Sequence, residues 1–145
     1  MKLKAIISDL DGTLCQVNNR VKYIDSGEWD YFHTAGCMET PNQWCLDILH
    51  RFKKDHRILI VTGRPITYLE ETHAWLLDRC YFRPNDYDLF MAPPGMVDIK
   101  YKPLVYQQYI QPKFQVEFVL DDRPSLVEAW RAMGLVCLQP NFVDH

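Results

Sequence analysis

The sequence has few of the features that mark extracellular or membrane proteins. Its five cysteines are odd in number and none lie in a C-x-x-C pair, so we expect reduced thiols and no disulfide framework or zinc site. No apolar run approaches the ~18 residues that a membrane-spanning helix needs. The short apolar run at the N-terminus meets acidic residues at once, which is untypical of a secretion signal. We therefore expect a soluble, cytoplasmic protein.

A strong charge of one sign and a flexible linker are also absent. The sequence has sixteen Lys and Arg residues and nineteen Asp and Glu residues, which gives a net charge of −3. Such a chain has no global basic field to hold long nucleic acid non-specifically, which leaves only local basic patches for that purpose. No Gly/Ser-rich stretch divides the 145 residues, and this length is typical of one domain.

Short apolar runs alternate with longer amphipathic stretches, which predicts an α/β fold: a doubly wound, three-layer domain around a parallel sheet. We expect strands near residues 3–8, 57–62, 88–92, 116–120 and 135–138. We expect helices near residues 41–54, 67–80, 103–110 and 125–133. Residues 15–36 are irregular and polar, and they predict a small flap or hairpin rather than a core element.

Two carboxylates follow the first predicted strand directly, in the stretch Asp9-Leu10-Asp11-Gly12-Thr13. Residues i and i+2 point the same way where a strand ends, so both carboxylates can face one site. Gly12 allows the sharp turn that must come next. A solvated acidic turn is the alternative, but the position after a buried N-terminal strand favours a functional pair.

Two further polar groups stand at the ends of predicted elements. Thr62, Gly63 and Arg64 follow the second strand, where a hydroxyl and free backbone N–H groups can bind a phosphoryl oxygen. A simple strand-to-helix turn explains them equally well. Lys100 and Lys102 precede the helix predicted at 103, and a cation there could neutralise a carboxylate or a phosphoryl group.

A second acidic pair, Asp121 and Asp122, follows the fourth strand and precedes Arg123. Two unit charges 4 Å apart repel by about 4 kcal/mol at an effective dielectric near 20, so such a pair needs a positive partner. Together with the acids after the first strand, it predicts a divalent cation. Hard oxygen ligands without histidines at ligand spacing favour magnesium over zinc. The alternative is that Arg123 and Lys102 neutralise these acids in salt bridges.

This ordered set of residues resembles the four motifs of the haloacid dehalogenase (HAD) superfamily of phosphotransferases. Within that superfamily, the chain is most similar to the 3′-phosphatase module of phage-type polynucleotide kinase/phosphatases. The similarity favours Lys102 over Lys100 as the motif lysine. The stretches that carry it are 61–64, 102–114 and 121–139.

The resemblance implies a HAD-like sheet of strand order 3-2-1-4-5, no large cap domain, and Mg²⁺-dependent hydrolysis of a phosphomonoester. It implies that Asp9 attacks phosphorus to form an aspartyl-phosphate. Asp11 would act as general acid and then as general base. Asp9, the Asp11 backbone carbonyl and Asp122 would hold Mg²⁺. Asp121 would support the metal through water or orient Lys102.

The same resemblance implies roles for the remaining polar residues. Thr62 and Lys102 would bind phosphoryl oxygens and offset the charge of the nucleophile. Arg64 and Arg123 would contact the substrate beyond the scissile phosphate, and Gly63 would bind the substrate by offering backbone N–H groups to the phosphoryl anion.

The open, capless site favours a nucleotide or polynucleotide 3′-phosphate as substrate. The alternatives are a 5′-nucleotidase or small-metabolite phosphatase of the same superfamily, or a non-catalytic phosphate- or partner-binding module. Trp29, Tyr31 and Phe32 either stack a base or simply pack the flap. We interpret Trp130 as a core residue and assign the histidines no role. We expect no membrane contact and no obligatory protein partner.

Overall fold

Five parallel strands form one sheet in the order β3-β2-β1-β4-β5, which confirms the predicted strand order. The computed structural model describes residues 1–145. The strands are β1 (Leu3–Ser8), β2 (Arg57–Pro65), β3 (Tyr87–Ala92), β4 (Phe114–Leu120) and β5 (Cys137–Leu138). The helices are α1 (Val21–Asp25), α2 (Trp29–Gly36), α3 (Gln43–Phe52), α4 (Leu69–Asp78), α5 (Asp98–Val105) and α6 (Pro124–Ala132).

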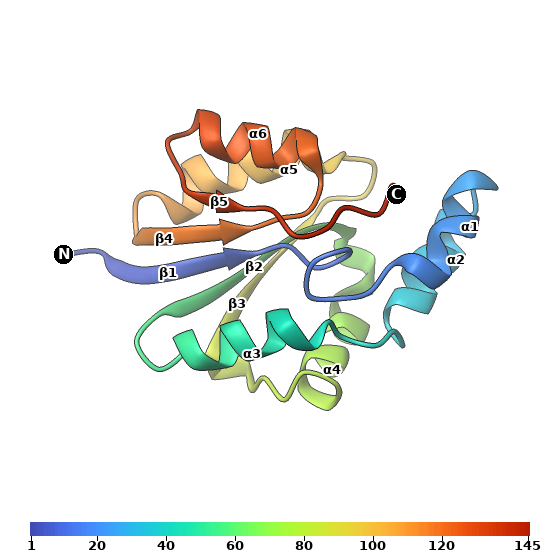
Figure 1. Cartoon of the computed structure of the whole chain (residues 1–145), viewed down its shortest axis with the longest axis horizontal. Coiled ribbons are helices and arrows are strands. Elements are labelled where there is room, and N and C mark those ends of the chain that lie inside the picture. The colour runs from blue at the N-terminus through green and yellow to red at the C-terminus, as the bar shows by residue number, and fades with distance from the viewer.

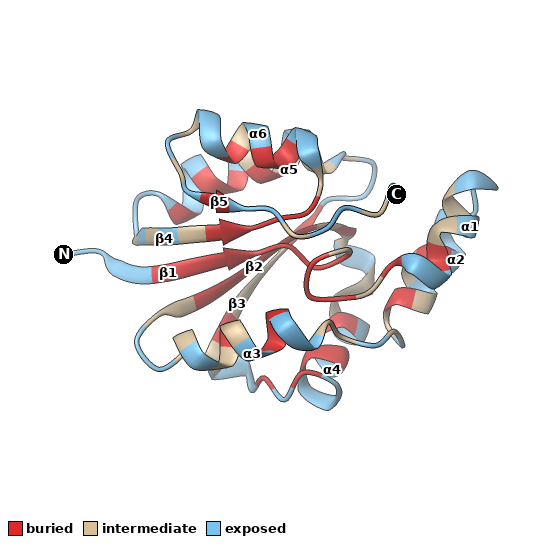
Figure 2. Ribbon diagram, viewed as in Figure 1, coloured by how far each residue is buried: buried red, intermediate tan, exposed pale blue.

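Helices cover both faces of the sheet, with α3 and α4 on one face and α5 and α6 on the other (Figure 1). This three-layer arrangement explains why the strand sequences are continuously apolar rather than alternating. In β1, Ile6 packs into the core beneath α3 and α4, whereas Ala5 and Ile7 pack into the core beneath α5 and α6. Figure 2 shows that burial is concentrated where the central strands end, beside the loops that carry the acidic motifs. No helix has the length and apolarity needed to cross a bilayer.

The segment predicted as an irregular flap is instead largely helical. Residues 18–36 form a short 3-10 turn, α1 and α2, and these helices project beyond the carboxyl ends of the strands (Figure 1). Asp30 in the first turn of α2 favours the helix electrostatically. Phe32 and Gly36 are its buried residues. The irregular or hairpin conformation expected for residues 15–36 is therefore wrong, because most of these residues are helical.

The helix predicted to begin at Pro103 begins five residues earlier, at Asp98. The prediction placed the proline in the first turn, where its missing N–H costs nothing. The structure places Pro103 inside α5, which continues as a π-helical turn over Tyr106–Ile110. As a consequence, Lys102 does not precede the helix but lies within it, and its side chain is buried.

Candidate active site

The acidic motifs meet at the carboxyl ends of β1 and β4, which are neighbours in the sheet. The backbone N–H of Asp9 donates to the Leu120 carbonyl at 2.8 Å, so the two strands stay paired up to the motifs themselves. Asp9, Asp121 and Asp122 are all buried, and one carboxylate oxygen from each lies within 4.8 Å of the others. We call these three residues the acid cluster.

Lys102 is the cation that contacts the acid cluster. Its Nζ donates to Asp9 Oδ1 and to Asp121 Oδ2, each at 2.8 Å. Burial, followed by the charge of Asp121, holds the pKa of Asp9 well above its usual range, although Lys102 opposes this. The two carboxylates hold the pKa of Lys102 above its usual value despite its burial. One ammonium therefore faces three carboxylates, and the site retains an excess of negative charge.

Asp122 is positioned by the turn that carries the first motif. The Thr13 hydroxyl donates to Asp122 Oδ1 at 3.1 Å, and His145 Nε2 lies 2.9 Å from Oδ2. Burial disfavours the ionised form of Asp122, but the hydrogen bonds from His145 and neighbouring groups hold its pKa below the usual value. Gly12 has φ +92°, and any Cβ there would overlap the Asp122 carboxylate. Glycine is thus required for this turn to lie against the acid.

Asp121 accepts hydrogen bonds on both oxygens. Besides Lys102, the indole Nε1 of Trp130 donates to Oδ2 at 3.0 Å, and the Arg123 backbone N–H donates to Oδ1 at 3.3 Å. Trp130 is buried in the core, as predicted, and its N–H also fixes the carboxylate. This arrangement suits a residue that orients Lys102.

Asp11 is not part of the acid cluster, and its carboxylate instead contacts two arginines. Arg20 Nη2 and Arg64 Nη2 donate to Asp11 Oδ1 at 2.7 and 2.8 Å. Burial opposes ionisation, but Arg64 and Arg20 hold the pKa of Asp11 far below its usual range. Arg64 also donates to Thr72 Oγ1, and Arg20 donates to the Phe32 carbonyl at 3.1 Å. Arg20 therefore connects Asp11 directly to the flap helix α2.

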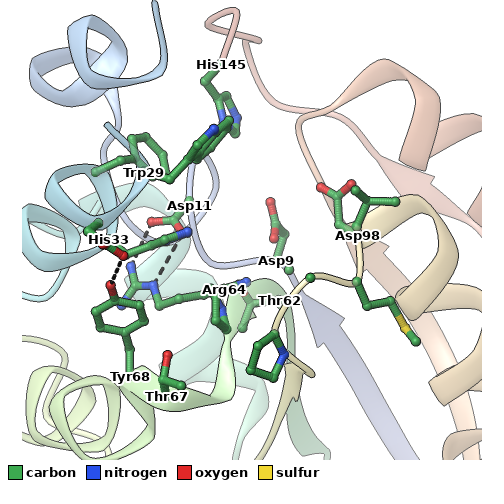
Figure 3. A pocket seen from close by; sticks show the side chains of 18 of the residues that line it. Asp9, Asp11, Trp29, His33, Thr62, Arg64, Thr67, Tyr68, Asp98 and His145 are labelled. Carbon is green, nitrogen blue, oxygen red and sulfur yellow. Dashed lines mark hydrogen bonds and ion pairs between the residues drawn. The ribbon is translucent and has the colours of Figure 1, made fainter. Parts of the chain in front are cut away.

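A pocket of about 630 Å³ opens above Asp9, Asp11 and Thr62. Figure 3 shows the Asp9 carboxylate directed into this space, between the flap and the loop that carries Asp98. Thr62 Oγ1 accepts the Arg64 backbone N–H at 3.0 Å, which leaves the hydroxyl proton free to be donated. These positions match what binding of a phosphoryl oxygen requires.

The predicted substrate-contacting residues also line this pocket: Gly63, Arg64 and Arg123. The Arg123 guanidinium pairs with Asp98 Oδ2 at 3.1 Å and donates to the His145 carbonyl at 2.8 Å. It does not neutralise the acid cluster, so the salt-bridge alternative applies to Lys102 alone. Arg64 is almost fully buried and is held by Asp11 in this conformation.

The structure thus brings all the predicted site residues to one end of the sheet. It also adds residues to which the sequence analysis gave no functional role: Arg20, Trp130 and His145. The distance of His145 from Asp122 along the chain conceals their contact. Arg20 lies in a segment without any motif, and only its separation of nine residues from Asp11 could have hinted at a local pair.

Residues 3–145 match the family model described as the polynucleotide kinase PNKP phosphatase domain. The chain belongs to this family. Its membership and fold make it a HAD-type phosphatase, as the motifs predicted. The chain spans only part of the length of the larger proteins that it matches.

Two chains of greater length illustrate this. A protein of Autographa californica nuclear polyhedrosis virus, named for polynucleotide kinase and RNA ligase activities, is 30% identical over 139 residues, which are 91% of this chain and 18% of the viral protein. A chain of the solved Pnkp1/Rnl/Hen1 complex is 31% identical with a TM-score of 0.82, covering 99% of this chain and 48% of that one.

More distant structures share the fold alone. The class C acid phosphatase of Bacillus anthracis is 18% identical with a TM-score of 0.64, and the match covers 97% of this chain and 68% of that one. The HAD-like hydrolase SP0104 of Streptococcus pneumoniae is 13% identical with a TM-score of 0.63, covering 94% and 84% of the two chains. These matches agree with the small capless HAD fold described above.

The contacts of Arg20 lead to a prediction for stability. Arg20→Gln should lower the free energy of unfolding at pH 7 by about 2–4 kcal/mol, because it removes one partner of a buried ion pair. The pKa of Asp11 is lowered in the fold, so the pairing stabilises the protein above the unfolded value near ~3.9 and fades as the pH falls below it. Arg64 still pairs with Asp11 in this variant, so denaturant titrations should show the difference in unfolding free energy from wild type beginning to narrow at about pH 3 and narrowing further at lower pH.

The matched control for this prediction is the exposed neighbour Lys22. Lys22→Gln should change the free energy of unfolding by no more than about 0.5 kcal/mol at either pH. A difference between Arg20→Gln and wild type that is independent of pH would contradict the role given to the Arg20–Asp11 pair.

Proposed function

We propose that this chain is a Mg²⁺-dependent phosphomonoesterase that removes 3′-phosphates from polynucleotide ends through an aspartyl-phosphate on Asp9. The observation that carries the proposal is the acid cluster at the base of an open pocket, in a chain of the PNKP phosphatase family. A buried carboxylate whose pKa is raised is costly to ionise, and a bound divalent cation would remove that cost.

The donor set fits magnesium. The carboxylates of Asp9 and Asp122, with the Asp11 backbone carbonyl, offer hard oxygen atoms, and this cation usually binds through one or two carboxylates plus substrate phosphate. Three acidic side chains meet a single lysine in this cluster, an arrangement that favours binding of a further positive charge. When bound, Mg²⁺ would offset negative charge on the phosphoryl group.

The residues of this chain would carry out the reaction in two steps, formation of the aspartyl-phosphate and its hydrolysis. A carboxylate oxygen of Asp9 attacks phosphorus, the bond from phosphorus to the ester oxygen breaks, and Asp11 donates its proton to the leaving 3′-oxygen. A water molecule then attacks the same phosphorus and gives a proton to Asp11, which releases Asp9 and inorganic phosphate. Lys102 and Thr62 would hold phosphoryl oxygens throughout.

The two arginines that contact Asp11 set its protonation state before substrate binds, and this state suits only one of its two roles. They keep Asp11 ionised, which suits the base that accepts a proton from water. The acid role requires a protonated Asp11, and the dianionic phosphate that arrives beside it would raise its pKa toward that state. Arg20 and Arg64 would thus tune Asp11 for the second half of the reaction.

Phosphate release from matched oligonucleotides would test the proposal. With Mg²⁺, the isolated chain should act on an oligonucleotide with a 3′-phosphate far faster than on the same sequence with a 5′-phosphate, and chelation by EDTA should stop the reaction. Turnover of 5′-nucleotides or small phosphate esters together with inertness toward every oligomer would contradict it. Activity of the isolated chain would also test the prediction that no protein partner is needed.

A further inference from the structure

The outer half of the pocket is lined by aromatic side chains that the proposed chemistry does not use. They come from the flap helix α2 and from the turn before α4. Trp29 and His33 are stacked with ring centroids 6.1 Å apart, and the ring centroids of His33 and Tyr68 are 5.3 Å apart. We call these three residues the aromatic wall. In Figure 3 they lie on the side of the pocket opposite Asp98, and Asp9 lies between the two sides.

The aromatic wall is open to a ligand. Trp29 is 48% exposed, although it is one of the largest apolar side chains of the protein. The opposite wall is a loop that is also partly apolar, with Met96 and the exposed Val97. An exposed tryptophan beside a second apolar surface, at the mouth of a pocket, is typical of a binding site for a flat ring.

The charged groups around the aromatic wall are already paired within the protein. Arg64 is bound to Asp11, and Arg123 to Asp98 and the His145 carbonyl. Asp30, at the base of the wall, accepts a hydrogen bond from the Tyr68 hydroxyl at 3.1 Å. In the outer pocket, both arginines are therefore engaged by groups of the protein, and the aromatic rings offer a surface that carries no charge.

We propose that the aromatic wall binds the base of the terminal nucleotide, the one whose phosphate lies on Asp9. This inference rests on the proposed function and specifies its substrate: a strand whose last base is unpaired and free to stack. A pocket of about 630 Å³ is within the range that holds a nucleotide-sized ligand. Stacking on an aromatic side chain tolerates any base, because every base has a π face.

Two oligonucleotide substrates test this inference. One carries its 3′-phosphate on a natural terminal nucleotide, and the other has the same sequence but ends in a 3′-phosphorylated abasic sugar. The readout is the base dependence, defined as the ratio of kcat/KM for the two substrates. Stacking on an aromatic side chain predicts a ratio of about 5 to 150 for the wild type. Trp29→Ala should reduce the ratio at least about fivefold, and Trp29→Phe should retain most of it.

Trp44→Ala is the matched control, because Trp44 is a similarly exposed tryptophan that does not line this pocket. It should keep the ratio of the wild type. Equal kcat/KM on both substrates in the wild type would overturn the inference and leave the proposed phosphatase function intact. An equal loss on both substrates in Trp29→Ala, with the ratio unchanged, would also overturn it. Absence of phosphate release from either substrate would instead refute the proposed function.

Discussion

Asp9→Asn should abolish phosphate release while making the metal-free protein more stable. The activity should fall on the order of 10⁴–10⁶-fold, as expected when a covalent nucleophile is removed. Stability should rise at neutral pH, because the pKa of Asp9 is raised in the fold and the ionised side chain is therefore unfavourable there. The amide keeps the shape of the carboxylate and carries no charge toward Asp121 and Asp122.

Phosphate release and thermal unfolding with EDTA measure the two effects. Mg²⁺ should raise the melting temperature of the wild type more than that of Asp9→Asn, since the variant lacks one metal ligand. Asp78→Asn is a suitable control, because Asp78 is an exposed acid at the end of α4. A variant that is less stable than the wild type in EDTA would contradict the claim that the acid cluster carries excess negative charge.

Lys102→Met should produce the opposite effect on stability. The substitution removes the cation that contacts two of the three cluster carboxylates and leaves a buried charge without compensation, which costs about 3–5 kcal/mol. Activity should also fall, by about 10²–10³-fold, as when one donor to a developing negative charge is lost. Thermal or denaturant unfolding in EDTA measures the loss of stability.

Added Mg²⁺ should recover part of the stability lost in Lys102→Met, because the ion replaces a positive charge in the acid cluster. Lys100→Met provides the control, since Lys100 is an exposed lysine on the same helix α5. Its stability and activity should stay close to those of the wild type. Wild-type stability of Lys102→Met in EDTA would mean that the acid cluster does not depend on this lysine.

Much of the site could be predicted because its residues stand at strand ends. Asp9, Thr62 and Asp121 each follow a run of apolar residues, and parallel strands bring their carboxyl ends to one edge of the sheet. The strand order then followed from the family resemblance. The pattern of strands and polar residues thus predicted that the acids meet at one edge of the sheet, and the resemblance added that β1 and β4 are neighbours.

The residues that could not be predicted depend on contacts between distant or irregular segments. Arg20 reaches Asp11 from the 3-10 turn before α1 and also donates to the Phe32 carbonyl of α2, and no periodicity in residues 15–36 indicated these helices. The position of Lys102 inside α5 was missed because Pro103 resembled a helix start. His145 contacts Asp122 through the path of the C-terminal segment, which has no sequence signal of its own.

The central claim is that Asp9 accepts the phosphoryl group within a metal-dependent acid cluster. The most direct test incubates the protein and Mg²⁺ with an oligonucleotide whose 3′-phosphate is radiolabelled, quenches with acid and maps the labelled peptide. We expect transient label on the peptide that contains Asp9, and none with EDTA or in Asp9→Asn. Release of labelled phosphate without labelled protein at any time, or label on another residue, would contradict the account.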